Sequence, residues 1–256
     1  MDAVEPPPLE EIPEPTSVAA KLFNVIAAPG DVFEELRFAK VRLVNWLVPL
    51  LLMIAVTCVF TFSAFRNPAV VHGIQEQQAG QIRKSMAGRK GMTEEKIEKA
   101  VEGARKFMTP TMLSIIGMTL ASLAVVVFLF GQGFVLWVVD RAWLRTGTDL
   151  MRFVEICGVA ESINVLSTIV RIFIVQGTGN MQVGTSPALL LKPFDPTNPG
   201  HLVLNNVELF FLWYLAVVAL GISVVTRTTY LKSLVGAAVV WLAMTALAVL
   251  PALAAR

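Results

Sequence analysis

The sequence predicts an all-α, polytopic membrane protein, a bundle of five transmembrane helices preceded by amphipathic N-terminal helices. Apolar stretches of about 18 residues or more, enough to cross a bilayer as a helix, recur along the chain. No charge interrupts the 33 residues between Lys106 and Asp140. Only 16% of all residues are charged, against about 25% in an average soluble domain. A soluble protein would not contain such long stretches of Leu, Val, Ala and Phe without charged residues between them.

Residues 1–17 form an acidic, Pro-rich tail that we expect to be disordered, because it contains almost nothing to bury. The tail lacks a basic region followed by an apolar one, so no cleavable signal peptide is expected. The first spanning helix would then act as the targeting signal.

Residues 18–43 are predicted to be an amphipathic cytoplasmic segment of two helices, separated at Pro29-Gly30. Apolar side chains lie on one face of each helix and basic side chains lie around them. One interpretation places these helices in the headgroup region of the anionic inner leaflet. The other packs them onto the protein's own bundle. On the first interpretation the inserted residues are Leu22, Phe23, Ile26, Phe33 and Leu36, and the residues that meet lipid phosphates are Lys21, Arg37, Lys40 and Arg42.

The membrane domain is predicted over residues 44–255. Its first and second spans are separated by an extramembrane insertion, residues 66–109, in which Thr93 is positioned to cap a helix. The third span is the least apolar, and without it the chain would cross the membrane four times. The five predicted spans are residues 44–65, 110–139, 153–175, 208–226 and 233–254.

The third span carries the candidate intramembrane polar site. Glu161, Asn164, Thr168 and Arg171 fall within an arc of about 80° on a helical wheel. Charges at the bilayer centre are costly, so this face should turn inward. The four side chains could line a solute or proton path, or each could satisfy a partner on another span. Glu208, at the start of the fourth span, is a possible partner for Arg171 or a simple helix N-terminal charge.

No catalytic, cofactor-binding or metal-binding motif is present, so the chain is not expected to be an enzyme or to need a cofactor. His72 and His201 are isolated loop residues. Cys58 and Cys157 lie in apolar segments and are expected to be buried hydrophobes, although a disulfide is possible on count alone. The net charge of +2 is too small to indicate a nucleic-acid partner.

The charges of the loops indicate an orientation in the membrane. Total Lys and Arg numbers on the two sides are similar, but the two short loops on the N-terminal side are basic. On the other side, the longer loop of residues 176–206 contains a single Lys and no Arg. Short loops report orientation best. We therefore expect a multi-pass protein of the cell inner membrane, with a cytoplasmic N-terminus and an extracytoplasmic C-terminus.

Two stretches carry a resemblance to a known family. Residues 22–29 (LFNVIAAP) followed by Phe33, and residues 207–213 (VELFFLW) followed by Leu220-Gly221 and Lys232-Ser233, are similar to the Yip domain of the Ypt/Rab-interacting protein family, as found in bacterial members. The resemblance covers roughly residues 18–253. It implies five spans, a cytoplasmic N-terminus and no assigned activity for bacterial members. Eukaryotic relatives are linked to Rab GTPases and membrane traffic. The insertion at 66–109 departs from the compact eukaryotic pattern.

Two function classes follow. The first is a structural or interaction protein of the lipid bilayer that organises membrane or recruits partners, including other membrane proteins or further copies of itself. The second is a small transporter or channel that uses the polar face of the third span. Five spans without an internal repeat is unusual for a transporter, so the first class is favoured.

Overall fold

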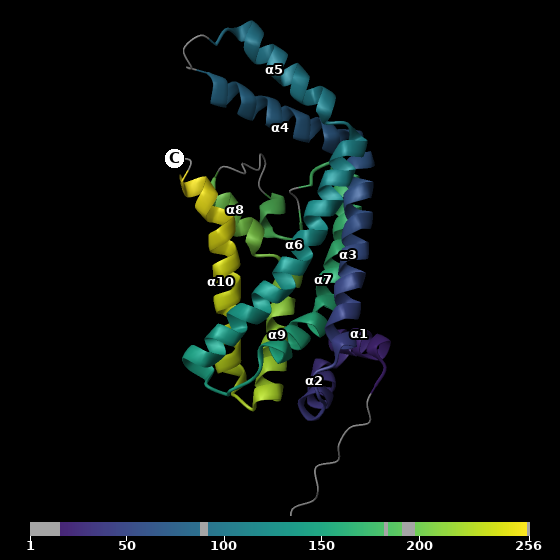
Figure 1. Cartoon of the computed structure of the whole chain (residues 1–256), viewed down its shortest axis with the longest axis vertical. Helices are drawn as coiled ribbons and strands as arrows, with labels where there is room; N and C mark the ends of the chain where they lie inside the picture. Colours follow the sequence, from purple (N-terminus) through teal and green to yellow (C-terminus); the bar gives the residue numbers. More distant parts are fainter. Residues whose placement is uncertain (1–15, 88–91, 182–183, 191–197, 255–256) are drawn as a thin grey trace, which may run out of the picture.

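The computed structural model describes residues 16–87, 92–181, 184–190 and 198–254. Within these ranges the chain is helical and contains no strand, which confirms the all-α class. Figure 1 shows an elongated bundle with short helices at one end and a two-helix arm at the other. The predicted disordered tail, residues 1–17, lies outside the described residues except for Thr16 and Ser17.

Among the described residues, four helices are long and apolar enough to cross a membrane. They are α3 (Leu43–Arg66), α6 (Pro110–Val139) with its π-helical continuation η1 (Asp140–Leu144), α7 (Leu150–Thr178) and α9 (Leu209–Thr226). The doubtful third span, α7, is therefore a membrane-length helix. The last helix, α10 (Tyr230–Ala254), runs beside α9 (Figure 1).

The central element of the bundle is α7, which contacts α1, α3, α6 and α9. Every residue from 153 to 163 is buried. Close approach of α3 depends on Gly158, because a Cβ there would lie 2.6 Å from Trp46 Cβ and 2.7 Å from Trp46 Cα. Small residues allow such backbone contact between membrane helices. This central position explains how α7 can carry charges that an exposed span could not.

The helices α1 (Val18–Ala27) and α2 (Pro29–Phe38) pack on the bundle. Phe33 and Leu36 have no exposed surface and belong to the main core. Gly221 of α9 leaves room for the Phe33 ring, since a Cβ there would lie 2.7 Å from it. Phe33 and Leu36 therefore do not insert into lipid, and the prediction that they do was wrong. An apolar helix face has the same sequence pattern whether lipid or protein covers it. Phe23, 75% exposed, remains free to meet lipid.

Lys21 was also expected to meet lipid phosphates, and the structure corrects this expectation. Its side chain is 1% exposed, and Nζ lies 2.8 Å from Glu35 Oε1. Glu35 Oε2 accepts hydrogen bonds from the backbone N–H and the hydroxyl of Thr16. Burial alone would raise the pKa of Glu35, but the bonds from Lys21 and Thr16 outweigh burial and leave that pKa below its usual value. The ion pair thus joins α1 to α2.

The predicted extramembrane insertion is a two-helix arm made of α4 (Pro68–Met86) and α5 (Glu94–Phe107). Asn67 caps α4, and Thr93 caps α5 as predicted. An ion pair of 2.6 Å between Arg105 and Glu76 crosses between the two helices. The arm extends past the end of the bundle opposite α1 and α2 (Figure 1). On the same side, η2 (Pro187–Leu190) and α8 (Pro199–Asn206) lie between α7 and α9 in the chain.

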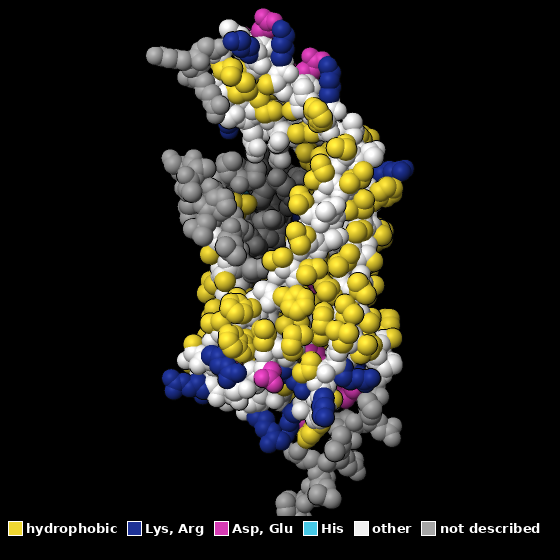
Figure 2. Space-filling view, in the orientation of Figure 1, with side chains coloured by type: hydrophobic (Ala, Val, Ile, Leu, Met, Phe, Trp, Pro, Cys, Tyr) yellow, Lys and Arg dark blue, Asp and Glu magenta, His cyan; other side chains and the backbone are white. Residues whose placement is uncertain are grey.

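The surface of the bundle is divided into bands. Figure 2 shows a broad hydrophobic belt, with Lys and Arg gathered at the end that carries α1 and α2 and again on the arm. Exposed side chains such as Leu120 at 61% and Val127 at 62% contribute to the belt. A contiguous apolar surface of this extent marks contact with lipid rather than water.

The close contact at Gly158 yields a stability prediction. Replacing Gly158 with Ala places a methyl group against the backbone of Trp46, which cannot move aside without separating α3 from α7. Overpacking of this kind costs about 1–3 kcal/mol, so the melting temperature of the full chain in detergent should fall. The matched control is Gly103→Ala in α5, where nothing lies within 4 Å of the added Cβ and helix propensity improves. Equal stability of the two variants would contradict the packing described.

Candidate functional site

Buried polar side chains gather at two levels of α7, and the first is near its beginning. Glu155 is fully buried. Its Oε1 accepts hydrogen bonds from the backbone N–H of Arg42 at 3.0 Å and from Asn45 Nδ2 at 2.7 Å. Its Oε2 lies 2.6 Å from the Arg152 guanidinium, one turn earlier on the same helix. The carboxylate is therefore held by groups from α3, the α2–α3 link and α7 itself.

Arg152 extends this cluster to α2. Its two terminal nitrogens donate to the carbonyl oxygens of Leu36 at 2.8 Å and Ala39 at 2.6 Å. These carbonyls lie at the C-terminal end of α2, where a helix leaves its last acceptors unpaired. The Arg152–Glu155 pair thus fastens the end of α2 and the start of α3 to α7. Both carboxylate oxygens of Glu155 and both terminal nitrogens of Arg152 are hydrogen-bonded, which gives the cluster a structural character, although Asn45 Oδ1 is buried without a partner among the described atoms.

The second level is a cleft of about 310 Å³, lined by residues of α3, α6, α7 and α9. It contains all five residues that the sequence predicted as an intramembrane polar site. Helical spacing brings the α7 members to one face, and Glu208 joins them because it is the N-cap residue of α9. The rest of the lining is mainly apolar. The cleft residues are Met53, Ala124, Val125, Phe128, Glu161, Asn164, Ser167, Thr168, Arg171, Glu208 and Phe211.

Glu161 is the deepest acid of the cleft and is 2% exposed. Its carboxylate accepts one hydrogen bond from Asn164 Nδ2 at 2.8 Å. Thr168 uses its hydroxyl to bond the carbonyl oxygen of Asn164, at 2.8 Å. Within the described part of the chain, no Lys, Arg or His forms an ion pair with Glu161.

Arg171 and Glu208 lie in the same cleft but do not form the ion pair that the sequence suggested. An Arg171 terminal nitrogen donates to the carbonyl oxygen of Met181 at 2.9 Å, and Arg171 Nε is buried without a partner among described atoms. Glu208 accepts hydrogen bonds from the hydroxyls of Ser167 at 2.8 Å and Thr185 at 3.1 Å. Arg171 is therefore hydrogen-bonded to the segment after α7, and Glu208 to one hydroxyl of α7 and one of that segment. The Glu208 charge still acts on Arg171 across the cleft, without direct contact.

Sequence reasoning missed several buried polar residues. Gln132 and Tyr214 are at most 2% exposed. The Tyr214 hydroxyl lies near the side chains of Gln132 and Cys157, but neither it nor Gln132 Nε2 makes a hydrogen bond of good geometry with a described atom. The Glu155 cluster was missed as well. Its only local signal is the three-residue spacing of Arg152 and Glu155, which places oppositely charged groups on one face of a helix.

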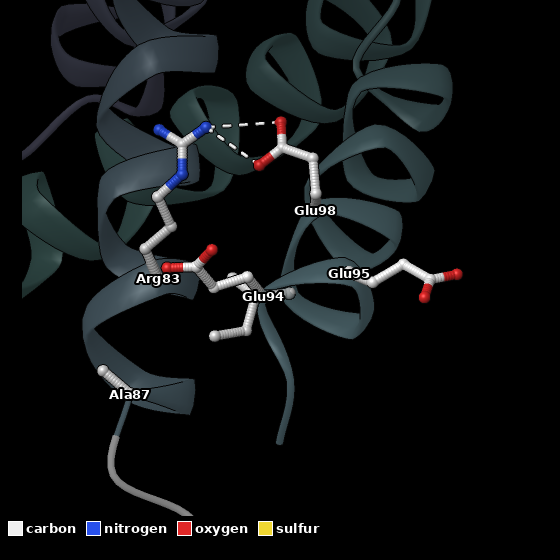
Figure 3. Close-up of a pocket in the computed structure, with 6 residues that line it drawn as sticks. Arg83, Ala87, Glu94, Glu95 and Glu98 are labelled. Carbon is white, nitrogen blue, oxygen red and sulfur yellow. Dashed lines mark hydrogen bonds and ion pairs between the residues drawn. The ribbon is translucent and has the colours of Figure 1, made fainter.

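A larger hollow of about 590 Å³ lies at the tip of the arm (Figure 3). In this view Arg83 of α4 points across to Glu98 of α5, with nitrogen–oxygen distances of 3.2 and 3.4 Å. Both side chains are about half exposed or more, so the pair contributes little to stability. Ala87, which lines the hollow, is the last described residue before the gap at 88–91, so we assign no site to the hollow.

Comparison with known proteins finds no matching family model, no matching curated protein and no matching solved structure. Among the described residues no three His, Cys, Asp or Glu side chains are placed to hold a metal ion. Cys58 and Cys157 are both free thiols. Cys157 is buried, as predicted for both, whereas Cys58 is only partly buried.

Proposed function

We propose that this chain is a five-span protein of the inner membrane, of the bacterial Yip type, that organises membrane or recruits partners rather than catalysing a reaction. The observation that carries this proposal is the arm of α4 and α5. It stands clear of the bundle (Figure 1) and, of the described elements outside the arm, chiefly contacts α3. Its two helices contact one another, with the buried apolar side chains Ala79 on α4 and Val101 on α5, and exposed ion pairs cross between them. Such an arm offers a large extramembrane surface to a partner.

The orientation follows from the ends of the bundle. The α6–α7 and α9–α10 connections lie at the same end as α1 and α2 (Figure 1). They carry Arg141, Arg145, Arg227 and Lys232. Short basic loops favour the cytoplasmic side, which would put the arm outside the cytoplasm. The 25-residue length of α10 is sufficient for a fifth crossing.

The second candidate function is transport through the cleft of α7. It is favoured by one specific observation, namely that all five predicted polar residues line a single cavity. Because transport also needs access from both sides of the membrane, we rank this function below the interaction role.

The topology is tested by labelling single cysteines in a background in which Cys58 and Cys157 are replaced by Ala. An impermeant maleimide added to intact cells should label Thr178→Cys and a cysteine added after Arg256. It should leave Arg145→Cys unlabelled until the membrane is opened. Labelling of Arg145→Cys and Thr178→Cys from the same side would remove α7 as a span. A C-terminal cysteine on the side of Arg145 would remove α10.

The interaction role is tested by photocrosslinking in the native membrane. A photoreactive amino acid replaces Lys84 on α4 or Lys99 on α5, both of which are exposed. We expect discrete protein adducts from both positions, since the arm is free to meet a partner. The matched control is Leu120, 61% exposed in the apolar belt of α6, which should yield lipid adducts. Arm positions that give no discrete adduct under conditions where Leu120 labels lipid would contradict the proposal.

A further inference from the structure

We propose that the cleft of α7 binds a lipophilic ammonium ion, with the Glu161 carboxylate as counter-ion and the rings of Phe128 and Phe211 as apolar wall. This site depends on the chain being embedded in a bilayer. It is independent of whether the arm recruits a partner.

The charged side chains that line the cleft indicate that its ligand is positively charged. Its charged side chains are two carboxylates, Glu161 and Glu208, and one guanidinium, Arg171. Arg171 lies ten residues beyond Glu161, about 15 Å along the helix axis, and its described hydrogen bond is to Met181. Glu161 therefore keeps a single amide donor and no cationic partner among the described residues. An intramembrane acid in this state is stable when protonated or when a cation lies beside it, and a cation in the cleft would favour its charged form.

The lining favours an organic cation over a metal ion. Ca²⁺ and Mg²⁺ take six or more oxygen ligands, whereas few polar groups lie near Glu161, namely the Asn164 amide, the Cys157 thiol and the Tyr214 hydroxyl. The side chains of α3, α6 and α9 that line the cleft are mainly apolar. The rings of Phe128 on α6 and Phe211 on α9 have their centroids 6.4 Å apart at 46°. Aromatic faces attract an ammonium group within about 6 Å of their centroids. Asn164 and Thr168 add amide and hydroxyl oxygens that could accept N–H donors.

Size and access limit the ligand further. The volume of about 310 Å³ lies at the lower end of small-molecule sites, about 300–1,000 Å³. It suits one aromatic ring with a short amine and is too small for a whole phospholipid. The rim includes Ala124, which is exposed, between Leu123 and Val127, which are 59% and 62% exposed on the apolar belt. A ligand dissolved in the bilayer can therefore enter sideways.

The test uses the full chain in nanodiscs of zwitterionic lipid and three probes of similar size. These are phenethylammonium, the neutral phenethyl alcohol and the anionic phenylpropanoate. Affinity is measured from the dose dependence of the melting temperature and from saturation-transfer NMR. We expect the ammonium to bind at least about tenfold more tightly than the alcohol, as a desolvated charge pair implies. The anion should not bind.

Variants link this preference to Glu161. Glu161→Gln keeps the size of the side chain and should abolish the preference for the ammonium. Glu102→Gln, the same substitution at an exposed site on α5, should leave it unchanged. Ala124→Trp obstructs the rim while retaining Glu161, and it should weaken binding of ammonium and alcohol alike even if Glu161→Gln does not fold. Three results would each overturn the proposal: equal affinity for ammonium and alcohol in the unaltered chain, a preference that survives Glu161→Gln, or binding that Ala124→Trp does not weaken.

Discussion

The buried carboxylate of Glu155 is the interaction on which the arrangement of this protein depends. A buried charge is tolerated only where partners replace the water that it has lost. Here the partners come from three parts of the fold, namely α7 itself, α3 and the link before α3. Arg152 neutralises the charge, Asn45 binds it from α3, and the backbone of Arg42 binds it from the link before α3. Since Arg152 also bonds the last carbonyls of α2, one pair of side chains fixes where α2 ends, where α3 begins and how both meet α7.

This cluster makes the N-terminal helices part of the bundle. With α2 held against α7, Phe33 enters the core beside Gly221, and Lys21 can form its buried ion pair with Glu35. A basic, apolar segment of the kind that can bind a membrane surface is largely used for internal packing here. Phe23 is among its residues that stay exposed. The polar cleft then lies farther along α7, on a helix whose first turns are rigidly held.

A feature could be predicted from the sequence when it depends on residues close together in the chain, and not when it depends on residues far apart. The apolar runs of α3, α6 and α9 are visible locally because hydropathy needs no knowledge of neighbours. The polar stripe of α7 was also predictable from helical spacing, and all its members line one cleft together with Glu208. The partners of Glu155 were not predictable, since Arg42 and Asn45 are 113 and 110 residues away in the chain. The burial of Phe33 and Leu36 could not be predicted for another reason. An apolar helix face has the same sequence pattern whether it packs on protein or inserts into lipid.

The account is tested most directly by amide hydrogen exchange on the full chain in detergent, comparing the unaltered protein with Glu155→Gln. Removing one charge of a buried pair costs about 3–5 kcal/mol, and the loss should appear where the cluster acts. In the unaltered protein, α1 and α2 should be protected as strongly as the first turns of α7. In Glu155→Gln, all three segments should exchange faster while α4 and α5 stay unchanged. Fast exchange of α1 and α2 in the unaltered protein, or protection that survives the substitution, would contradict the central role of this carboxylate.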